Sequence, residues 1–252
     1  MKKVVLITGG ARRIGAALCY AFVAEGWRVV IHCNRSRTSA ERLVLRLGGE
    51  DVVASVLVAD LRHEASGLIA RAVDVFGRLD GVVNNASIYC KRPVDALTEV
   101  SLREDFELNF FAPFALMREF AARRKPGFIL NLLDGRIAKQ DPDAAGYLLA
   151  KQSLAEATRL GALAWAPLGI RVNGLAPGLV RPADGVPMAR MNRLVAQLPL
   201  KRRTSEQELA DAAIFLATSP GITGEVLYVD AGMHLSPPQW KESKGEDPRG
   251  NA

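Results

Sequence analysis

Cysteine, histidine and aromatic residues are scarce in this sequence, and the few that occur are scattered. Its 252 residues contain 3 cysteines and 3 histidines, with no CxxC pair and no local metal-ligand spacing. The sequence therefore predicts neither a bound metal nor a disulfide framework, and so low a cysteine count is typical of a reducing cytoplasm. Aromatic residues make up only 6% of the chain, which disfavours a protein that stacks nucleic-acid bases on exposed rings.

Long apolar runs are absent as well. None approaches the ~20 residues of a membrane-spanning helix, and the apolar start at Val4–Ile7 ends too early for a signal peptide. The chain is moderately basic, with 33 Lys and Arg against 27 Asp and Glu and a net charge of +6. Because no nucleic-acid motif accompanies the basic residues, we predict neither a membrane nor a nucleic-acid partner. An anionic cofactor or substrate accounts for part of the excess charge.

What the sequence has is a regular alternation of short apolar segments with helical periodicity, and 49% hydrophobic residues, enough for a large core. Short segments rich in β-branched residues are typical of parallel strands covered on both faces. We therefore predict a single α/β domain over residues 1–235, a Rossmann-type doubly wound parallel sheet of about seven strands with helices on both faces. The predicted strands are Val4–Thr8, Arg28–Cys33, Val52–Ala59, Gly81–Asn85, Phe128–Leu133, Arg171–Ala176 and Val226–Val229.

Helical periodicity marks the segments between these strands. The first helix has one apolar face that runs from Ile14 to Phe22, and Gly26 ends it. Ser205 and Glu208 form a capping-box pattern at the start of the last helix. After the first helix, the predicted helices are Ser39–Leu47, Glu64–Phe76, Leu102–Arg124, Tyr147–Trp165 and Ser205–Thr218.

Two regions depart from this alternation. Residues 178–200 form a long insertion that contains Pro and Met, and we predict a substrate loop with some helix, in which Arg181, Asp184 and Met188 are candidate contacts. Residues 236–252 are rich in proline and charge, which predicts a flexible C-terminal tail.

A glycine-rich turn follows the first strand. Gly9, Arg13, Ile14 and Gly15 lie where that strand passes into the first helix. Glycines at such a turn let the backbone approach a pyrophosphate, which then sits at the helix N-terminus. A glycine pair alone is often only a tight turn, but the strand–turn–helix context favours a dinucleotide site.

The second strand leads into a basic segment and lacks the Asp or Glu with which NAD enzymes hold the ribose 2′-hydroxyl. Its arginines and serine are donors for a 2′-phosphate, and Arg13 adds a further positive group. Exposed arginines at a strand end often have no function, yet three around one position favour NADPH over NADH. The segment comprises Asn34, Arg35, Ser36 and Arg37, while Asp60 and Leu61 end the third strand, where the carboxylate is a candidate acceptor for the adenine amino group.

Candidate catalytic residues follow later strands. Tyr147 and Lys151 are four residues apart and share a helix face. Because a nearby ammonium favours the ionised form of a tyrosine, Lys151 is a candidate electrostatic partner for Tyr147 as proton donor. Asp134 follows a strand at the carboxyl edge, where α/β sheets hold ligands, although such an acid often only starts a turn. Asn109 lies in an apolar run and is either a structural bridge or part of a proton path.

Taken together, these motifs resemble the short-chain dehydrogenase/reductase family, over residues 1 to about 235. The resemblance implies hydride transfer, Tyr147 as acid, Lys151 at the nicotinamide ribose, Asn109 supporting a water relay, and a homotetramer. It also implies cofactor contacts from Asn85, Ala86, Ser87, Pro177 and Gly178. The residues that carry it are Thr8, Gly9, Gly15, Asp60, Asn84–Ala86, Asn109, Tyr147, Lys151 and Asn173–Gly178.

Two departures from the usual family pattern narrow this resemblance. Arg13 replaces a glycine of the turn, and Asp134 replaces the catalytic serine thirteen residues before Tyr147. Both features are similar to pteridine reductases, in which an aromatic residue at the position of Tyr89 stacks on the pterin and Ser87 contacts cofactor and substrate. The implied substrate is therefore a pterin or folate, bound by Arg13, Ser87, Tyr89, Asp134 and Tyr147.

Other functions remain open at this point. A 3-oxoacyl carrier-protein reductase or another carbonyl reductase of the same family is the nearest alternative, although those enzymes usually need the serine that Asp134 replaces. A non-catalytic NADPH-binding protein is an alternative of another class. Which pterin is reduced, whether fully oxidised folate or biopterin, a 7,8-dihydro form, a quinonoid form or a monapterin, depends on residues 178–200.

Overall fold

The computed structural model describes residues 2–49, 53–182 and 187–236. Its seven strands form one sheet in the order β3-β2-β1-β4-β5-β6-β7, and every neighbouring pair is parallel. The prediction of a doubly wound parallel sheet of the Rossmann type is confirmed. The strands are β1 (Val4–Ile7), β2 (Arg28–Cys33), β3 (Ala54–Val58), β4 (Gly81–Asn84), β5 (Gly127–Leu132), β6 (Ile170–Pro177) and β7 (Val226–Val229).

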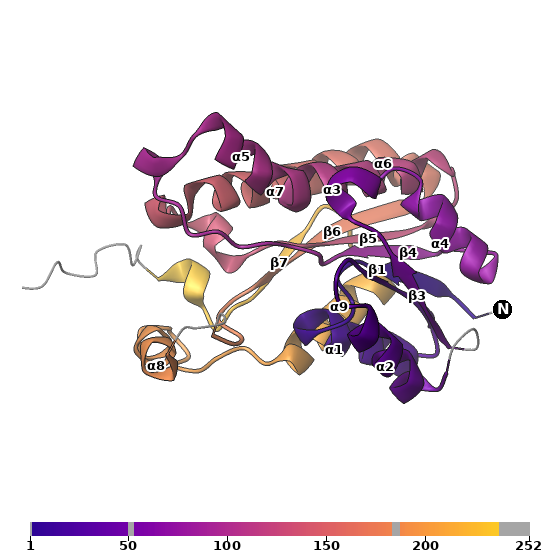
Figure 1. The fold of residues 1–252 in the computed structure, drawn as a ribbon, viewed down its shortest axis with the longest axis horizontal. Helices are drawn as coiled ribbons and strands as arrows, with labels where there is room; N and C mark the ends of the chain where they lie inside the picture. The colour runs from indigo at the N-terminus through magenta and orange to yellow at the C-terminus, as the bar shows by residue number, and fades with distance from the viewer. Residues whose placement is uncertain (1, 50–52, 183–186, 237–252) are drawn as a thin grey trace, which may run out of the picture.

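Helices cover both faces of the sheet (Figure 1). One layer holds α1 (Arg13–Ala24), α2 (Arg37–Leu47) and α9 (Glu206–Thr218), and the other holds α4 (Leu68–Phe76), α5 (Glu99–Phe106), α6 (Ala112–Ala122) and α7 (Ala145–Trp165). Two apolar cores result, one between the sheet and each layer. In the core of α1, α2 and α9, Phe22 packs against Trp27 and Phe128, with ring centroids 5.4 and 5.9 Å away.

Two predicted helices are interrupted, each for a local reason. Of the helix predicted at Glu64–Phe76, only α4 is present, and Glu64 instead ends the short helix α3 (Leu61–Glu64), because Gly67 before α4 adopts a φ of +81° that no right-handed helix has. The helix predicted at Leu102–Arg124 comprises α5, a π-helical segment at Glu107–Phe111, and α6. Pro113 lacks the N–H that an α-helix would bond to the carbonyl of Asn109, so the regular pattern cannot run through this point.

The remaining predicted helices and strands differ from the observed ones only at their ends. The capping box is present, since Ser205 accepts from the backbone N–H of Glu208 and the Glu208 carboxylate accepts from the N–H of Ser205. The predicted substrate loop contains the helix α8 (Met188–Ala196). Asp184 and residues 237–252 lie outside the described residues, as does Val52, the predicted start of the third strand. In the described ranges, no helix is long and apolar enough to cross a bilayer.

Candidate active site

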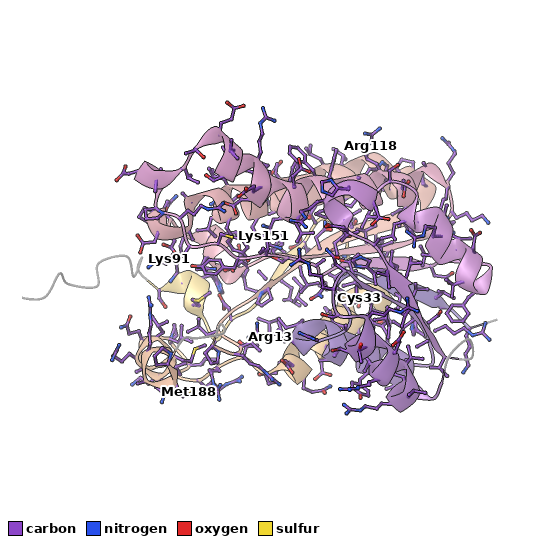
Figure 2. The ribbon with its side chains drawn as sticks, in the orientation of Figure 1. Arg13, Cys33, Lys91, Arg118, Lys151 and Met188 are labelled. Carbon is purple, nitrogen blue, oxygen red and sulfur yellow. The ribbon has the colours of Figure 1, made fainter. Side chains whose placement is uncertain are left out.

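The loops that follow β1, β4, β5 and β6 meet at the carboxyl edge of the sheet and line two adjoining cavities. The strand order reverses between β1 and β4, which is where ligands bind in folds of this type. The larger cavity, about 1040 Å³, runs along the β1 and β2 side, and the smaller, about 280 Å³, lies over β5 and β6. Figure 2 shows Arg13 and Lys151 projecting from opposite helix layers toward this region, with Met188 farther out on α8.

The structure brings almost all of the predicted site residues to these cavities. The smaller one is lined in part by Arg13, Ile14, Asn85, Ser87, Asp134, Tyr147, Lys151, Pro177, Gly178 and Arg181. The larger one is lined in part by Gly9, Arg13, Ile14, Gly15, Asn34, Arg35, Ser36, Asp60, Leu61, Asn85, Ala86, Ser87 and Tyr89.

The glycine turn is held rigid by the loop after β4. The side-chain amide of Asn85 donates to the carbonyl oxygens of Thr8 and Gly9 at 2.8 and 3.1 Å, and the Thr8 hydroxyl accepts from the N–H groups of Asn85 and Ala86. A Cβ on Gly15 would collide with the carbonyl oxygen of Gly9, so the first turn of α1 can approach only with a glycine there. Close packing of the backbone therefore requires a glycine at position 15.

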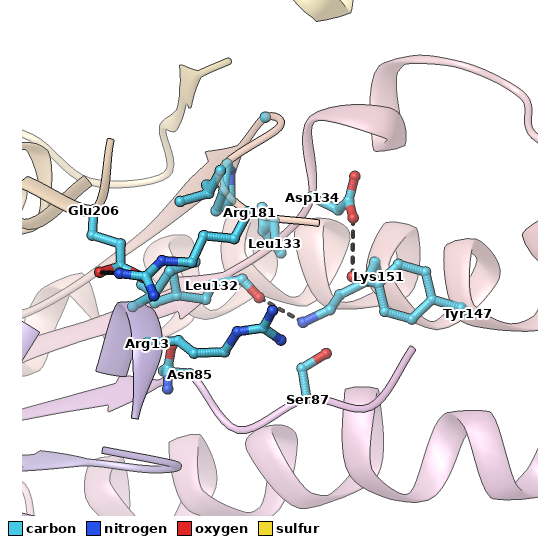
Figure 3. A pocket seen from close by; sticks show the side chains of 14 residues that line it. Arg13, Asn85, Ser87, Leu132, Leu133, Asp134, Tyr147, Lys151, Arg181 and Glu206 are labelled. Atoms are coloured by element: carbon cyan, nitrogen blue, oxygen red, sulfur yellow. Dashed lines mark hydrogen bonds and ion pairs between the residues drawn. The ribbon is translucent and has the colours of Figure 1, made fainter. Parts of the chain in front are cut away.

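Arg13 takes up the left-handed backbone conformation, with a φ of +53°. Non-glycine residues rarely adopt this region and pay a strain energy when they do. The Arg13 side chain crosses the cavity edge and donates to the carbonyl oxygen of Pro182 at 2.9 Å. Figure 3 shows its guanidinium pointing into the pocket, on the side of Lys151 and Ser87.

His32 supports the same turn and was not singled out by the sequence. The backbone N–H of Gly9 donates to its Nδ1 at 3.2 Å, while Nε2 lies 3.1 Å from the carbonyl oxygen of Ala59. These partners require a neutral ring with its proton on Nε2, and burial lowers the pKa of His32, which favours that form. No sequence motif marks such a role, because it follows from the position of β2 between β1 and β3.

The basic segment after β2 is divided in two. Asn34, Arg35 and Ser36 line the larger cavity, whereas Arg37 begins α2 and its side chain pairs with Glu41 at 2.8 Å. Of the arginines expected around the 2′-phosphate, the structure thus places Arg13 and Arg35 at the cavity and assigns Arg37 another partner.

Asp60 also lines the larger cavity. Its carboxylate forms an ion pair with Arg62 at 2.7 Å and caps α3 by accepting from the N–H of Arg62. The hydrogen bonds from Arg62 lower the pKa of Asp60, which therefore acts as an acceptor. Leu61 beside it is buried and lines the cavity.

Tyr147 and Asp134 are in direct contact. The Tyr147 hydroxyl donates to Oδ2 of Asp134 at 3.0 Å, as Figure 3 shows. The pKa of Tyr147 is raised well above its usual value, first by burial and then by the Asp134 charge. The sequence-based expectation that Lys151 favours the ionised tyrosine is therefore wrong for this arrangement, since burial and the carboxylate dominate.

Lys151 is buried and turned toward the sheet. Its ammonium donates to the carbonyl oxygen of Leu132 at 2.7 Å and lies 6.0 Å from the centre of the Tyr147 ring. Burial lowers the pKa of Lys151 to about 8, and the charge of Asp134 opposes this shift.

Asn109 is fully buried within the π-helical segment, behind Ser87. Its side-chain oxygen accepts from the Ser87 hydroxyl at 2.7 Å and from the N–H of Ile88, and its amide donates to the carbonyl oxygens of Ile88 and Asp105. Three of these contacts hold the loop after β4, and the fourth ties Asn109 to α5. In this structure Asn109 is a structural bridge that fixes the position of Ser87.

Arg136 is a charged residue beside the site that sequence reasoning missed. It donates to both carboxylate oxygens of Asp134, from Nε at 3.1 Å and from Nη2 at 2.9 Å. Its guanidinium also lies 4.8 Å from the centre of the Tyr89 ring. A basic residue two positions after Asp134 was the available signal, but only the turn at Gly135–Ala138 brings the two side chains together.

Tyr89 forms the outer wall of the site. The residue is 44% exposed, and its ring lies edge-on to the Tyr147 ring, with centroids 5.1 Å apart. An exposed aromatic face beside a buried polar pair is suited to a flat ring that carries hydrogen-bonding groups at its edge. In the described parts of the chain, no three His, Cys, Asp or Glu side chains gather closely enough to hold a metal ion.

Comparison with known proteins agrees with this geometry. A family model described as Enoyl-(Acyl carrier protein) reductase matches residues 9–234. Pteridine reductase 1 of Leishmania tarentolae is 31% identical, covering 92% of this chain and 96% of the relative. A 3-oxoacyl-[acyl-carrier-protein] reductase of Synechocystis is 30% identical over the same shares of the two proteins.

A solved structure is also similar over nearly the whole chain. The crystal structure of FolM alternative dihydrofolate reductase 1 from Brucella canis, complexed with NADP, superposes with a TM-score of 0.88 at 34% identity, covering 94% of this chain and 95% of the other. With the parallel sheet, the glycine turn and the Tyr147–Lys151 pair, these matches show that the chain is an oxidoreductase of the short-chain dehydrogenase/reductase family.

Proposed function

We propose that this protein is an NADPH-dependent reductase that transfers a hydride to a C=N bond of a pterin, such as a dihydropteridine, a dihydrofolate or a biopterin-like substrate. The observation that carries the proposal is the pair formed by Asp134 and Tyr147, with Tyr89 as the wall beside them. An acid in place of the family's usual serine suits a substrate rich in N–H donors. The pteridine reductase and FolM relatives support the same substrate class.

The residues at the larger cavity fit NADPH. Gly9 and Gly15 line this cavity at the start of α1, where a pyrophosphate would sit at the helix N-terminus. Arg35, Ser36 and Arg13 supply donors where a 2′-phosphate would lie, and two solved relatives are NADP complexes. When bound, the cofactor supplies the hydride; Lys151 is placed to hold the nicotinamide ribose, beside Asn85, Pro177 and Gly178.

Proton delivery is assigned to Tyr147. Its raised pKa keeps the hydroxyl protonated at neutral pH, so the proton is available to a substrate nitrogen that gains negative charge during hydride transfer. Asp134 orients the hydroxyl and accepts N–H groups of the pterin edge, and Ser87, fixed by Asn109, is placed to contact both ligands. Arg13 points into the pocket, where it can meet a pterin carbonyl as well as cofactor phosphate.

Exchanging Asp134 tests the substrate class. Asp134→Ser restores the residue usual in carbonyl reductases of this family, so we expect it to lower kcat/KM for the pterin by at least about tenfold. NADPH affinity, measured by fluorescence titration, is expected to stay unchanged. Undiminished pterin turnover by this variant would remove Asp134 from the substrate site.

Reduction of a 3-oxoacyl thioester is the second candidate. The Synechocystis relative favours it. Activity with an acetoacetyl thioester but with no pterin would establish this alternative. NADPH binding without turnover of either substrate would instead indicate a non-catalytic NADPH-binding protein.

We also propose a homotetramer. Several large apolar side chains are exposed on the helix layer of α5, α6 and α7, which is a surface that a second copy of the chain would cover. They are Val100, Phe111, Leu149, Leu160 and Leu163.

A further inference from the structure

We propose that Arg136 is a positioning residue that clamps the Asp134 carboxylate and the Tyr89 ring, so that Asp134 meets the substrate as an ionised hydrogen-bond acceptor and never as its proton donor. This inference rests on the proposed function for the identity of the substrate. Its structural part, the state of Asp134, stands on contacts within this chain alone.

The hydrogen bonds around Asp134 leave no position for a proton. Oδ1 accepts from the backbone N–H and Nε of Arg136, at 2.9 and 3.1 Å. Oδ2 accepts from Nη2 of Arg136 at 2.9 Å and from the Tyr147 hydroxyl at 3.0 Å. A carboxylate has about four lone-pair sites: Arg136 donates to three, and the Tyr147 hydroxyl occupies the fourth until it turns to the substrate nitrogen, which frees that site on Oδ2 for a substrate N–H. A protonated Asp134 would have to give up at least one of these bonds.

The clamp is itself anchored on its outer side. Nη1 of Arg136 lies 3.3 Å from the Asp141 carboxylate and donates to the Tyr89 hydroxyl at 3.4 Å. The guanidinium is 4.8 Å from the centre of the Tyr89 ring and 5.5 Å from that of Tyr147. Because one planar group contacts the acid and both aromatic rings, it fixes the spacing between the acceptor and the aromatic wall.

The other charged groups around Asp134 do not replace Arg136. Lys151 of α7 is directed to the Leu132 carbonyl, and Asp230, which approaches Gly135 from the loop after β7, carries charge of the same sign as Asp134. Arg13 lines the same pocket but donates to Pro182. Arg136 accordingly lowers the pKa of Asp134 against the effect of burial, which alone would raise it.

The test compares Arg136→Met, which keeps bulk and removes charge, with Arg136→Lys. The matched control is Arg202→Met, because Arg202 holds Glu208 through the same two-bond pairing at 3.0 and 2.6 Å, outside the site. Carboxyl NMR of protein labelled with ¹³C-aspartate, assigned with Asp134→Asn, measures the ionisation of Asp134 without any substrate. Pterin turnover is followed in parallel across about pH 5–8.

We expect Asp134 to remain ionised throughout this range in the unmutated protein and to titrate within it in Arg136→Met. Pterin kcat/KM of that variant should fall about tenfold or more near pH ~6 and recover toward pH ~8, since one pKa unit changes the ionised fraction up to tenfold. Arg136→Lys should regain part of the loss, and the control should follow the unmutated protein.

Two results would overturn the clamp. One is titration of Asp134 near neutrality in the unmutated protein; the other is a rate loss in Arg136→Met that is equal at every pH, which indicates a structural role only. If no pterin is turned over but the NMR result is as expected, the proposed function fails and the clamp stands.

Discussion

Two charges of opposite sign face the Tyr147 hydroxyl, the carboxylate of Asp134 and the guanidinium of Arg136. Burial and the carboxylate raise the pKa of the phenol, and Arg136 offsets part of that rise. The tyrosine is thus held as a neutral acid whose hydrogen bond to Asp134 sets its direction.

Tyr147→Phe removes the transferable proton and keeps the ring. We expect pterin turnover to fall by about 10²–10⁴-fold, the usual contribution of a positioned acid, while NADPH binding is retained. Steady-state kinetics and a fluorescence titration measure the two effects. Tyr20→Phe, at an exposed position on α1, is the control, and an active Tyr147→Phe enzyme would exclude the assigned role.

Arg35→Ala tests the 2′-phosphate contact. Loss of a charge-assisted hydrogen bond of about 1.5–3 kcal/mol predicts NADPH affinity weaker by about ten- to a hundredfold, with NADH binding little changed. Arg37→Ala is the matched control, since Arg37 pairs with Glu41. Equal losses for the two cofactors in Arg35→Ala would show that the arginine does not distinguish them.

Residue by residue, the sequence predicted positions better than interactions. Tyr147, Lys151 and Asp134 line the same pocket. Their shared location could be predicted, because strand ends and helix spacing can be recognised in the sequence. The raised pKa of Tyr147, the turn that joins Arg136 to Asp134 and the support from His32 depend on burial and on contacts across strands. Local patterns carry no signal for these.

At the scale of elements, all seven strands were predictable because buried parallel strands are short and apolar throughout. Helix continuity was not. Periodicity continues across Gly67 and Pro113, whereas the backbone breaks at Gly67 and widens into a π-helix just before Pro113. The π-helical segment places Asn109 where its side chain holds Ser87, so this irregular element bears on the site.

Gly15→Ala tests the close approach of α1 to the glycine turn. The added methyl group would meet the carbonyl of Gly9 and the side chain of Asn85, so we expect a lower Tm, equivalent to about 1–3 kcal/mol of overpacking, and weaker NADPH binding. Thermal unfolding and cofactor titration measure both. Gly221→Ala, where no atom lies within 4 Å of the added carbon, serves as control. Equal behaviour of the two variants would contradict the packing argument.

At the scale of the molecule, the exposed apolar residues of α5, the π-helical segment and α7 predict self-association. Light scattering should give four times the chain mass of 27.3 kDa. Leu163→Lys, which places a charge at a side chain 80% exposed in the single chain, should yield smaller species. A monomer at micromolar concentration would contradict the tetramer.

The sheet brings four strand ends together around one pocket. Asp134 and Tyr147 line this pocket, and the Tyr89 ring packs against Tyr147. The most direct test is NADPH oxidation with a panel of dihydrobiopterin, dihydrofolate, dihydromonapterin and an acetoacetyl thioester, with NADH in parallel. We predict turnover of at least one pterin with NADPH preferred. Turnover confined to the thioester would retain the family and contradict the pterin site.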